Sequence, residues 1–165
     1  MRFALRLIAL LGASAAACSG TQWDGVTFRN DELAFRFGPT PESWRKLEVD
    51  GTLLAFRDDA DAATIALSGR CGLDGDDVPL TALTHHLFLQ FTDRELASQK
   101  TVELDGREAL RSELSAKLDG VPKHFVIYVL KKDGCVYDFM HIAPPSAPPN
   151  ASFEQMVRTF HTVRP

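Results

Sequence analysis

The sequence has little cysteine and lacks any long apolar run. Its three cysteines include no C-x-x-C pair, which argues against thiol redox catalysis and a zinc knuckle. The motifs G-x-S-x-G, H-E-x-x-H and G-x-x-x-x-G-K are absent as well. The sequence therefore predicts no catalytic residue, no metal site and no cofactor, and we expect a non-enzymatic protein.

The N-terminal segment has the order of a secretory signal peptide. Arg2 and Arg6 precede the apolar run Leu7–Leu11, and small residues follow as far as Ala17. This run is too short to span a bilayer as a permanent helix. We assign residues 1–17 to a signal peptide. The alternative, a buried N-terminal helix, is disfavoured because the segment has no polar face.

Cys18 directly follows these small residues, which resembles the lipobox of bacterial lipoproteins. There the cysteine becomes the acylated, palmitate-bearing first residue. Leucine usually stands three residues earlier, whereas this chain has Ala15, so ordinary cleavage after the alanines is the alternative. We predict lipidation of Cys18 and a location in the cell envelope. Ser19, where aspartate would indicate the inner membrane, favours the outer membrane, facing the periplasm.

Lipidation of Cys18 would leave two cysteines that can pair. In an oxidising compartment, we expect Cys71 and Cys135 to form a disulfide. Such a bond closes a loop of about 65 residues, worth roughly 4 kcal/mol in the chain-entropy model. Two separate buried thiols are the alternative, and only then is a Cys71–His141 catalytic dyad conceivable.

The charge and length of the mature chain limit its partners and its number of domains. Without residues 1–17, it has 16 Lys and Arg against 22 Asp and Glu, a formal charge of −6. This balance argues against nucleic acid as a partner. The remaining 148 residues suffice for one domain. We expect a lipidated tether over residues 18–25 and a single domain over residues 26–165.

A regular repeat of Asp-Gly organises the second half of the chain. The dipeptide occurs at 105–106, 119–120 and 133–134, with a constant spacing of 14 residues. Asp-Gly between apolar runs is a strong signal for a two-residue β-hairpin turn. The repeat therefore predicts four consecutive strands that form a meander.

The strands between these turns differ in their apolar patterns. Leu110 and Leu114 alternate with Arg111 and Glu113, which predicts one buried and one wet face. The next run, 124–130, is apolar on both sides and predicts a central strand covered on both faces. The last strand places on one face Cys135, Tyr137, Phe139 and His141.

Further elements complete the predicted fold. We expect a turn of helix around Glu42–Lys46 and helices over Pro79–Phe91 and Phe153–Phe160, the last with Ser152 and Gln155 in capping-box spacing. Shorter strands are expected at 26–29, 33–37, 53–57 and 64–70. Together these define an α+β fold, an antiparallel sheet with a C-terminal β-meander packed by helices.

Several features of this order point to one family. They are a lipidated N-terminus, an early P-E-S-W-R stretch, a mid-chain helix, a third meander strand reading H-F-V-I-Y-V-L and a final helix F-E-Q-M-V-R-T-F. Over most of residues 26–163 the chain thus resembles the PsbP-like fold, whose bacterial members include DcrB-like envelope lipoproteins. The resemblance implies an α/β/α sandwich that binds partners and offers no catalytic residue to carry over. The cysteine pair is not part of that pattern.

Histidines are the first candidates for chemistry. His85 and His86 are adjacent on a predicted helix and point about 100° apart, so we interpret them as surface residues rather than metal ligands. His141 and His124 lie on neighbouring predicted strands and could approach one another. The alternative is a sheet histidine that bonds a backbone carbonyl.

Acidic residues and prolines are the other candidates. Asp74, Asp76 and Asp77 resemble part of a calcium loop, but the glutamate at its twelfth position is missing. We interpret them as a solvated loop, and likewise Asp58, Asp59 and Asp61. The prolines predict an exposed extended connector or a docking site, and they are Pro144, Pro145, Pro148 and Pro149.

Two functions therefore remain open. The favoured one is an envelope lipoprotein that binds a protein partner through a sheet face, a sheet edge or the proline-rich loop. It is expected to lack a polar cleft. The alternative is a small-molecule or metal-binding module, or a hydrolase, with a site assembled from dispersed residues such as His124, His141 and Asp138. It is expected to have a pocket with converging polar groups.

Overall fold

The computed structural model describes residues 20–72 and 78–163 of the protein. Cys18, the predicted signal peptide and the cluster Asp74, Asp76 and Asp77 lie outside the described residues. Lipidation, export and the interpretation of that loop therefore stay predictions. Within the described ranges, no helix is long and apolar enough to cross a membrane.

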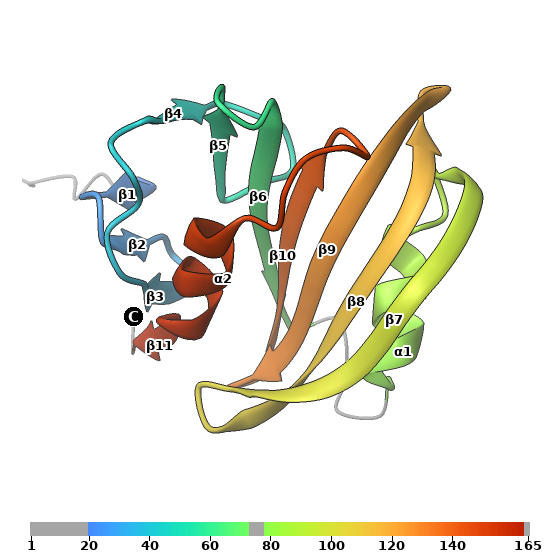
Figure 1. The fold of residues 1–165 in the computed structure, drawn as a ribbon. Coiled ribbons are helices and arrows are strands. Elements are labelled where there is room, and N and C mark those ends of the chain that lie inside the picture. The colour runs from blue at the N-terminus through green and yellow to red at the C-terminus, as the bar shows by residue number, and fades with distance from the viewer. Residues whose placement is uncertain (1–19, 73–77, 164–165) are drawn as a thin grey trace, which may run out of the picture.

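The described residues form two antiparallel sheets and two helices (Figure 1). In spatial order, the larger sheet consists of β4 (Trp44–Leu47), β5 (Leu54–Asp58), β6 (Ala63–Cys71), β10 (Cys135–Ala143), β9 (Val121–Lys132), β8 (Arg107–Leu118) and β7 (Thr92–Leu104). The smaller sheet consists of β1 (Gln22–Trp23), β2 (Thr27–Arg29), β3 (Ala34–Arg36) and β11 (His161–Val163). The helices are α1 (Leu80–Leu87) and α2 (Ala151–Arg158).

The predicted meander is confirmed as β7–β8–β9–β10, with each strand antiparallel to the next. Each connecting turn consists of one Asp-Gly pair. Asp105, Asp119 and Asp133 have φ values of 50°, 50° and 53°, and the glycine after each has φ between 71° and 78°. Both turn residues thus adopt the left-handed region that a type I′ hairpin requires. Asp and Gly tolerate this conformation, which explains the repeat.

Strand β9 is covered on both faces, as its apolar sequence predicted. Phe125, Ile127 and Val129 pack into an apolar cluster with α1, and we call this side of the larger sheet the α1 face. Val126, Tyr128 and Leu130 point to the other side, which we call the α2 face. There α2 and the smaller sheet provide the cover. Their core residues include Phe28, Phe35 and Phe153, and Phe160 lies between α2 and β11. The α+β class is confirmed.

A disulfide joins Cys71 to Cys135, at the ends of β6 and β10. The two cysteines are direct partners in the register of these neighbouring antiparallel strands. The bond links strands that lie 64 residues apart in the chain. Because Cys71 is bonded, the structure leaves no free thiol for a Cys71–His141 dyad.

Two local predictions were wrong. The stretch around Glu42–Lys46 contains the strand β4 instead of a helical turn, because the buried Trp44 pairs with β5 and its indole Nε1 donates to Asp58 Oδ2 at 3.1 Å. Helix α2 is capped by Asn150 instead of Ser152. The Asn150 Oδ1 atom accepts the amide of Phe153 at 2.8 Å, which is the usual N-cap bond.

Two short strands were not predicted. Strand β1 lies inside residues 18–25, which were assigned to the tether, and it pairs with β2. Strand β11 follows α2 and pairs with β3. Both contain only two or three residues, too few to show a periodic pattern. The fold therefore begins before Val26, and β11 closes the smaller sheet.

Candidate functional site

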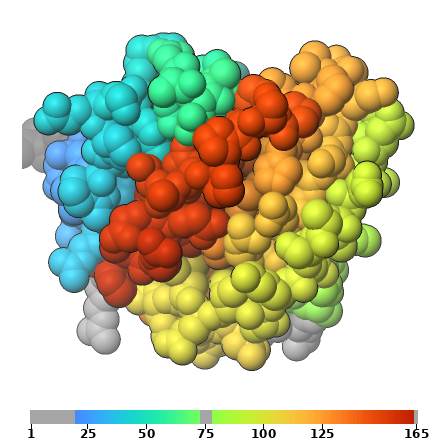
Figure 2. All heavy atoms as spheres, in the orientation of Figure 1, coloured from blue at the N-terminus to red at the C-terminus, as the bar shows by residue number. Residues whose placement is uncertain are grey.

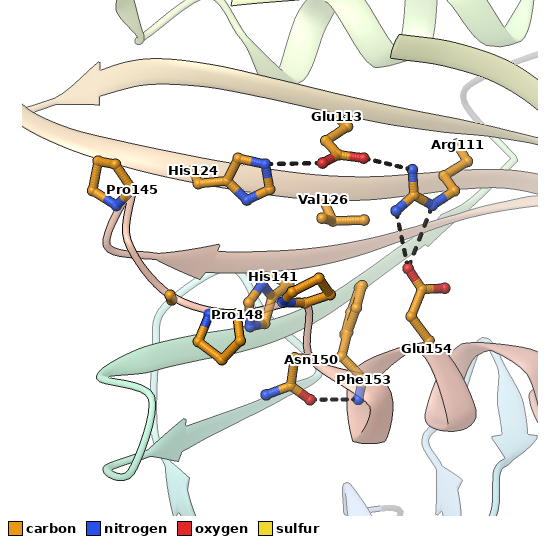
Figure 3. A pocket seen from close by; sticks show the side chains of 12 residues that line it. Arg111, Glu113, His124, Val126, His141, Pro145, Pro148, Asn150, Phe153 and Glu154 are labelled. Carbon is orange, nitrogen blue, oxygen red and sulfur yellow. Dashed lines mark hydrogen bonds and ion pairs between the residues drawn. The ribbon is translucent and has the colours of Figure 1, made fainter. Parts of the chain in front are cut away.

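A pocket opens on the α2 face where β8 and β9, the segment after β10 and the N-terminus of α2 meet (Figure 3). We call it the connector pocket, and its volume is about 240 Å³. Its apolar walls are Val126, Phe153 and the proline connector (residues 144–149). Its polar lining consists of Arg111, Glu113, His124, His141, Asn150 and Glu154. Figure 2 shows the connector and α2 as an orange-red band across this face of the molecule.

Arg111 is the centre of the polar lining. Its Nη1 donates to Glu113 at 3.0 Å, and its Nη2 donates to Glu154 at 3.1 Å. Its Nε donates to the Tyr128 hydroxyl at 3.1 Å, and that hydroxyl donates to the second oxygen of Glu154. These bonds connect β8, β9 and α2. They form a charge-assisted network that holds its side chains in one arrangement.

His124 extends this network toward the mouth of the pocket. Its Nε2 lies 3.1 Å from Oε1 of Glu113, whose other oxygen accepts from Arg111. The hydrogen bond from Arg111 is the main reason that the pKa of Glu113 lies below its ordinary value. Glu113 is therefore an anion at neutral pH, with the guanidinium on one side and the imidazole on the other (Figure 3).

His141 lies deeper in the same pocket. Its side chain is only 3% exposed, its ring lies 5.4 Å from that of Phe153, and its Nε2 atom has no hydrogen-bond partner. Burial is the main cause that lowers the pKa of His141, and the nearby His124 acts in the same direction. The imidazole is thus held neutral, with one nitrogen unsatisfied beside the pocket.

Asn150 fastens the end of the proline connector. Its Oδ1 caps α2, and its Nδ2 donates to Asp58 at 3.1 Å and to Asp61 at 3.3 Å. Asp58 also accepts from Trp44. The connector wall is therefore tied to β5 on one side and to α2 on the other.

A second pocket, of about 590 Å³, lies along the same face and shares Arg111, Glu113 and Glu154 with the first. It runs between β7 and α2, and it adds Lys100, Glu103 and Arg158 to the shared residues. Its three cations and three anions balance. The Arg111 ion pairs therefore separate two adjoining hollows of different charge on one concave surface. The expectation that a partner-binding module would lack a polar cleft was wrong, because strand register and the docking of α2 bring these charged side chains together.

The structure brings together some of the predicted candidates and separates others. His124 and His141 share the connector pocket, where Pro145, Pro148 and Pro149 form a wall. Asp138 does not join them, because it alternates with His141 on β10 and forms an ion pair with Arg70 on the opposite face. The proposed site of His124, His141 and Asp138 is therefore wrong.

Other candidates are exposed or serve the structure. His85 and His86 lie exposed on α1. Asp58 is buried and bonded to Trp44 and Asn150, so its interpretation as a solvated loop residue was wrong. In the described ranges, no group of three or more His, Cys, Asp or Glu side chains is placed to hold a metal ion.

Sequence reasoning missed Arg111, Glu113 and Glu154. Arg111 and Glu113 were assigned to a wet face, but Arg111 is half-buried, with its side chain 15% exposed. The turn at 119–120 contained a signal, because a two-residue hairpin fixes the register and places Arg111 opposite Tyr128. Nothing in the local sequence indicated that Glu154 of α2 would dock there.

Comparisons with known proteins agree on the fold. No known family profile matches the chain, and no curated protein matches its sequence. The solution structure of cyanobacterial PsbP (CyanoP) from Synechocystis sp. PCC 6803 is similar with a TM-score of 0.61 and 15% identity, over 93% of this chain and 99% of that one. LpqN of Mycobacterium tuberculosis, described as involved in cell envelope biogenesis, is similar with a TM-score of 0.56 and 16% identity, over 81% and 87%.

A third solved structure, PA94 from Pseudomonas aeruginosa, described as a putative regulator, has a TM-score of 0.52 and 16% identity, over 84% of this chain and 96% of that one. The chain therefore has the PsbP-like fold, as the order of its elements predicted. The narrower likeness to DcrB-like lipoproteins stays a prediction. At these identities the similarity describes the fold alone, so function must be argued from the site.

Proposed function

We propose that the chain is a non-enzymatic accessory module of the bacterial cell envelope that binds a protein partner with its α2 face. The observation that carries this proposal is the concave surface formed by the two adjoining pockets, whose shared charged side chains, Arg111, Glu113 and Glu154, are already held by the Arg111 network. Groups that are held in place before binding lose little freedom when a partner arrives. A partner can therefore use them as fixed points of recognition.

The chemistry of the connector pocket supports binding over reaction. Neither a hydroxyl nor a thiol side chain lines it, and its two carboxylates both pair with Arg111. Covalent catalysis needs a nucleophile beside an activating base. Two imidazoles, His124 and His141, also line the pocket, but the lining places no nucleophile beside them. The second pocket adds Ser98, which lies outside the connector pocket.

The proposed membrane attachment fits this surface. Lipidated Cys18 would hold the molecule beside β1, and Figure 1 shows β1 far from β7 and α1. The similar fold of LpqN, which is involved in cell envelope biogenesis, supports an envelope location. On the strength of Ser19, we place the anchor in the outer membrane, with the domain in the periplasm.

Site-specific photocrosslinking in the native envelope tests partner binding. A photoreactive residue replaces Ala147, which lines the connector pocket, or, as the matched control, the exposed His86 on the α1 face. We expect one discrete protein adduct from position 147 and none of that mass from position 86. An adduct of equal yield from both positions, or from position 86 alone, would contradict the assignment of the binding face.

The anchor has a separate test. Intact mass of the protein from its membrane fraction should equal residues 18–165 plus a lipid, with no alkylation until the disulfide is reduced. A Cys18→Ser variant should lose the lipid mass and leave the membrane fraction. An unlipidated native mass would contradict the anchor while leaving the α2 face to be judged by crosslinking.

A further inference from the structure

The connector pocket contains an unsatisfied hydrogen-bonding atom. His141 is 97% buried, and its Nε2 atom has no hydrogen-bond partner. A buried polar atom without a partner destabilises the fold unless something else bonds it. Because His141 also lines the pocket (Figure 3), a ligand in the pocket is placed to supply the missing bond.

The charge of the pocket indicates the sign of that ligand. Glu113 and Glu154 carry two negative charges, and Arg111 carries the only permanent positive charge in the lining. Behind the connector, Asp58 and Asp61 add negative charge that acts on His141. The pocket therefore has an excess of negative charge, which favours a cation and disfavours an anion.

The geometry of the lining indicates the kind of cation. Each carboxylate oxygen of Glu113 and Glu154 has a partner, yet an oxygen of this type accepts more than one hydrogen bond. These acceptors and the buried His141 occur beside the apolar surfaces of Val126, Phe153 and the prolines. A bare metal ion would make no contact with those apolar walls. A cationic group on a short aliphatic stem would contact both.

From this geometry we infer that the connector pocket binds a guanidinium or alkylammonium group carried on an aliphatic stem. The N–H groups donate to Glu113, Glu154 and the neutral Nε2 of His141, while the stem packs between Phe153 and the proline connector. A pocket of about 240 Å³ is below the usual range for drug-sized ligands and suits one such group. The charge-balanced second pocket has no comparable excess, which explains why we assign the cation to the first.

Two sources carry this chemistry: a basic side chain of a protein partner and a small free amine. Calorimetry on the purified domain, at low ionic strength, separates them with three probes. They are a blocked Gly-Arg-Gly peptide, the same peptide with citrulline, and agmatine. Citrulline keeps the shape of arginine and removes its charge. The inference does not depend on the proposed protein partner, because agmatine needs none.

We expect the arginine peptide to bind at least about tenfold more tightly than the citrulline peptide, since the ligand charge faces partly desolvated carboxylates. Binding by the peptide alone would indicate a partner's side chain, and comparable binding by agmatine would indicate that a free amine suffices. Equal affinity for arginine and citrulline, or no binding by any probe, would overturn the inference.

Two variants locate the effect. Glu113→Gln removes one pocket charge with little change in shape and should weaken arginine binding by about fivefold to tenfold. Glu108→Gln removes a charge from the same strand on the opposite face, where Glu108 is exposed, and should leave affinity unchanged. Equal losses in both variants would overturn the assignment. Amide NMR spectra of each variant verify that a loss of affinity for the arginine peptide does not come from unfolding.

Discussion

Neighbouring residues of β8 lie on faces with opposite character. Leu114 and Ala116 join the apolar cluster beneath α1, whereas Arg111 and Glu113, at the alternate positions of the strand, form ion pairs on the α2 face. Both sets belong to one strand and one regular register. The alternation of side chains lets one strand contribute to the core on one side and to a recognition surface on the other.

The polar side chains on the α2 face contribute less to the stability of the fold than the apolar ones. An ion-pair network in a half-buried position adds little to stability, because desolvation offsets much of the attraction. The unsatisfied Nε2 of His141 adds nothing to it. The α2 face also carries a large apolar cluster that includes Val126, Tyr128 and Phe153. We therefore infer that both faces stabilise the fold and that the Arg111–Glu113 part of the α2 face is kept polar for binding.

The first prediction compares two adjacent residues. Leu114→Ala, on the α1 face and 1% exposed, should lower the free energy of unfolding by about 2–5 kcal/mol because it leaves a cavity. Glu113→Gln should lower it by less than about 1 kcal/mol. Denaturant unfolding measures both. Comparable losses would show that the polar positions of β8 stabilise the fold as much as its apolar positions do.

The second prediction concerns the disulfide that joins β6 to β10. Reduction, or a double Cys71→Ser and Cys135→Ser variant, should lower the free energy of unfolding by about 2–4 kcal/mol, because it frees a loop of 64 residues in the unfolded chain. The arginine peptide should still bind if the variant remains folded, since neither cysteine lines the connector pocket. A change below about 1 kcal/mol would show that the bond contributes little.

The third prediction concerns Asp105, which ties the first meander turn to β11. Burial raises the pKa of its carboxyl, but hydrogen bonds from Lys132 and His161 and from the amide of Thr162 outweigh burial and hold the pKa at about 2. Since this pKa is below the ordinary 3.8, the stabilisation is present above pH 4 and lost as pH falls toward 2.

Asp105→Asn should therefore cost about 2 kcal/mol at neutral pH and much less near pH 2. Asparagine tolerates the left-handed turn conformation, so the turn itself is preserved. Asp119→Asn, at the equivalent position of an exposed turn, is the matched control and should change stability little. Equal losses in the two variants would contradict the role of Asp105 as a link.

The fourth prediction uses the acid sensitivity of His141. Burial lowers its pKa, so the unfolded chain takes up a proton there at a pH where the folded chain does not. Stability should therefore fall as pH drops below about 6.5, until the lowered folded-state pKa is reached. His141 faces His124 and the carboxylates of Asp58, Asp61 and Glu154.

Stability curves of the His141→Gln variant test this dependence. The slope between pH 7 and pH 5 should flatten in this variant and persist in the exposed-site control His86→Gln. An unchanged slope in His141→Gln would show that folding does not lower the pKa of this histidine.

The smallest expected effect is spectroscopic. The two tyrosines, Tyr128 and Tyr137, lie on the α2 face, where burial first, together with nearby carboxylates, raises the pKa of each to about 12. The ultraviolet phenolate band should thus develop near pH 12, above the usual value near 10. Glu154→Gln should lower the Tyr128 midpoint and leave that of Tyr137. A native titration near pH 10 would contradict burial at this face.

Patterns within a strand were predictable from the sequence, whereas contacts between distant segments were not. The Asp-Gly spacing predicted the meander, and the apolar run in β9 predicted a strand covered on both faces. The approach of His124 to His141 also followed from strand order. By contrast, the smaller sheet depends on β1 and β11, whose few residues have no readable period.

The candidate site also depends on contacts between distant segments, which the sequence did not predict. Whether Glu154 would pair with Arg111 depends on how α2 docks, and the amphipathic pattern fixes only which side of a helix is apolar. The prolines predicted an extended connector, but Asn150 decides its position through Asp58 and Asp61. Asp138 was placed in the wrong site because the parity of β10 was not applied to it.

The most direct test is a map of binding onto the two faces. With nitrogen-labelled domain, addition of the blocked Gly-Arg-Gly peptide should shift the amide signals of Phe153 and Glu154 and the imidazole signals of His124 and His141. The signals of α1, including Leu83, should stay in place. Shifts that centre on α1, or that spread evenly over both faces, would contradict the account that recognition belongs to the α2 face.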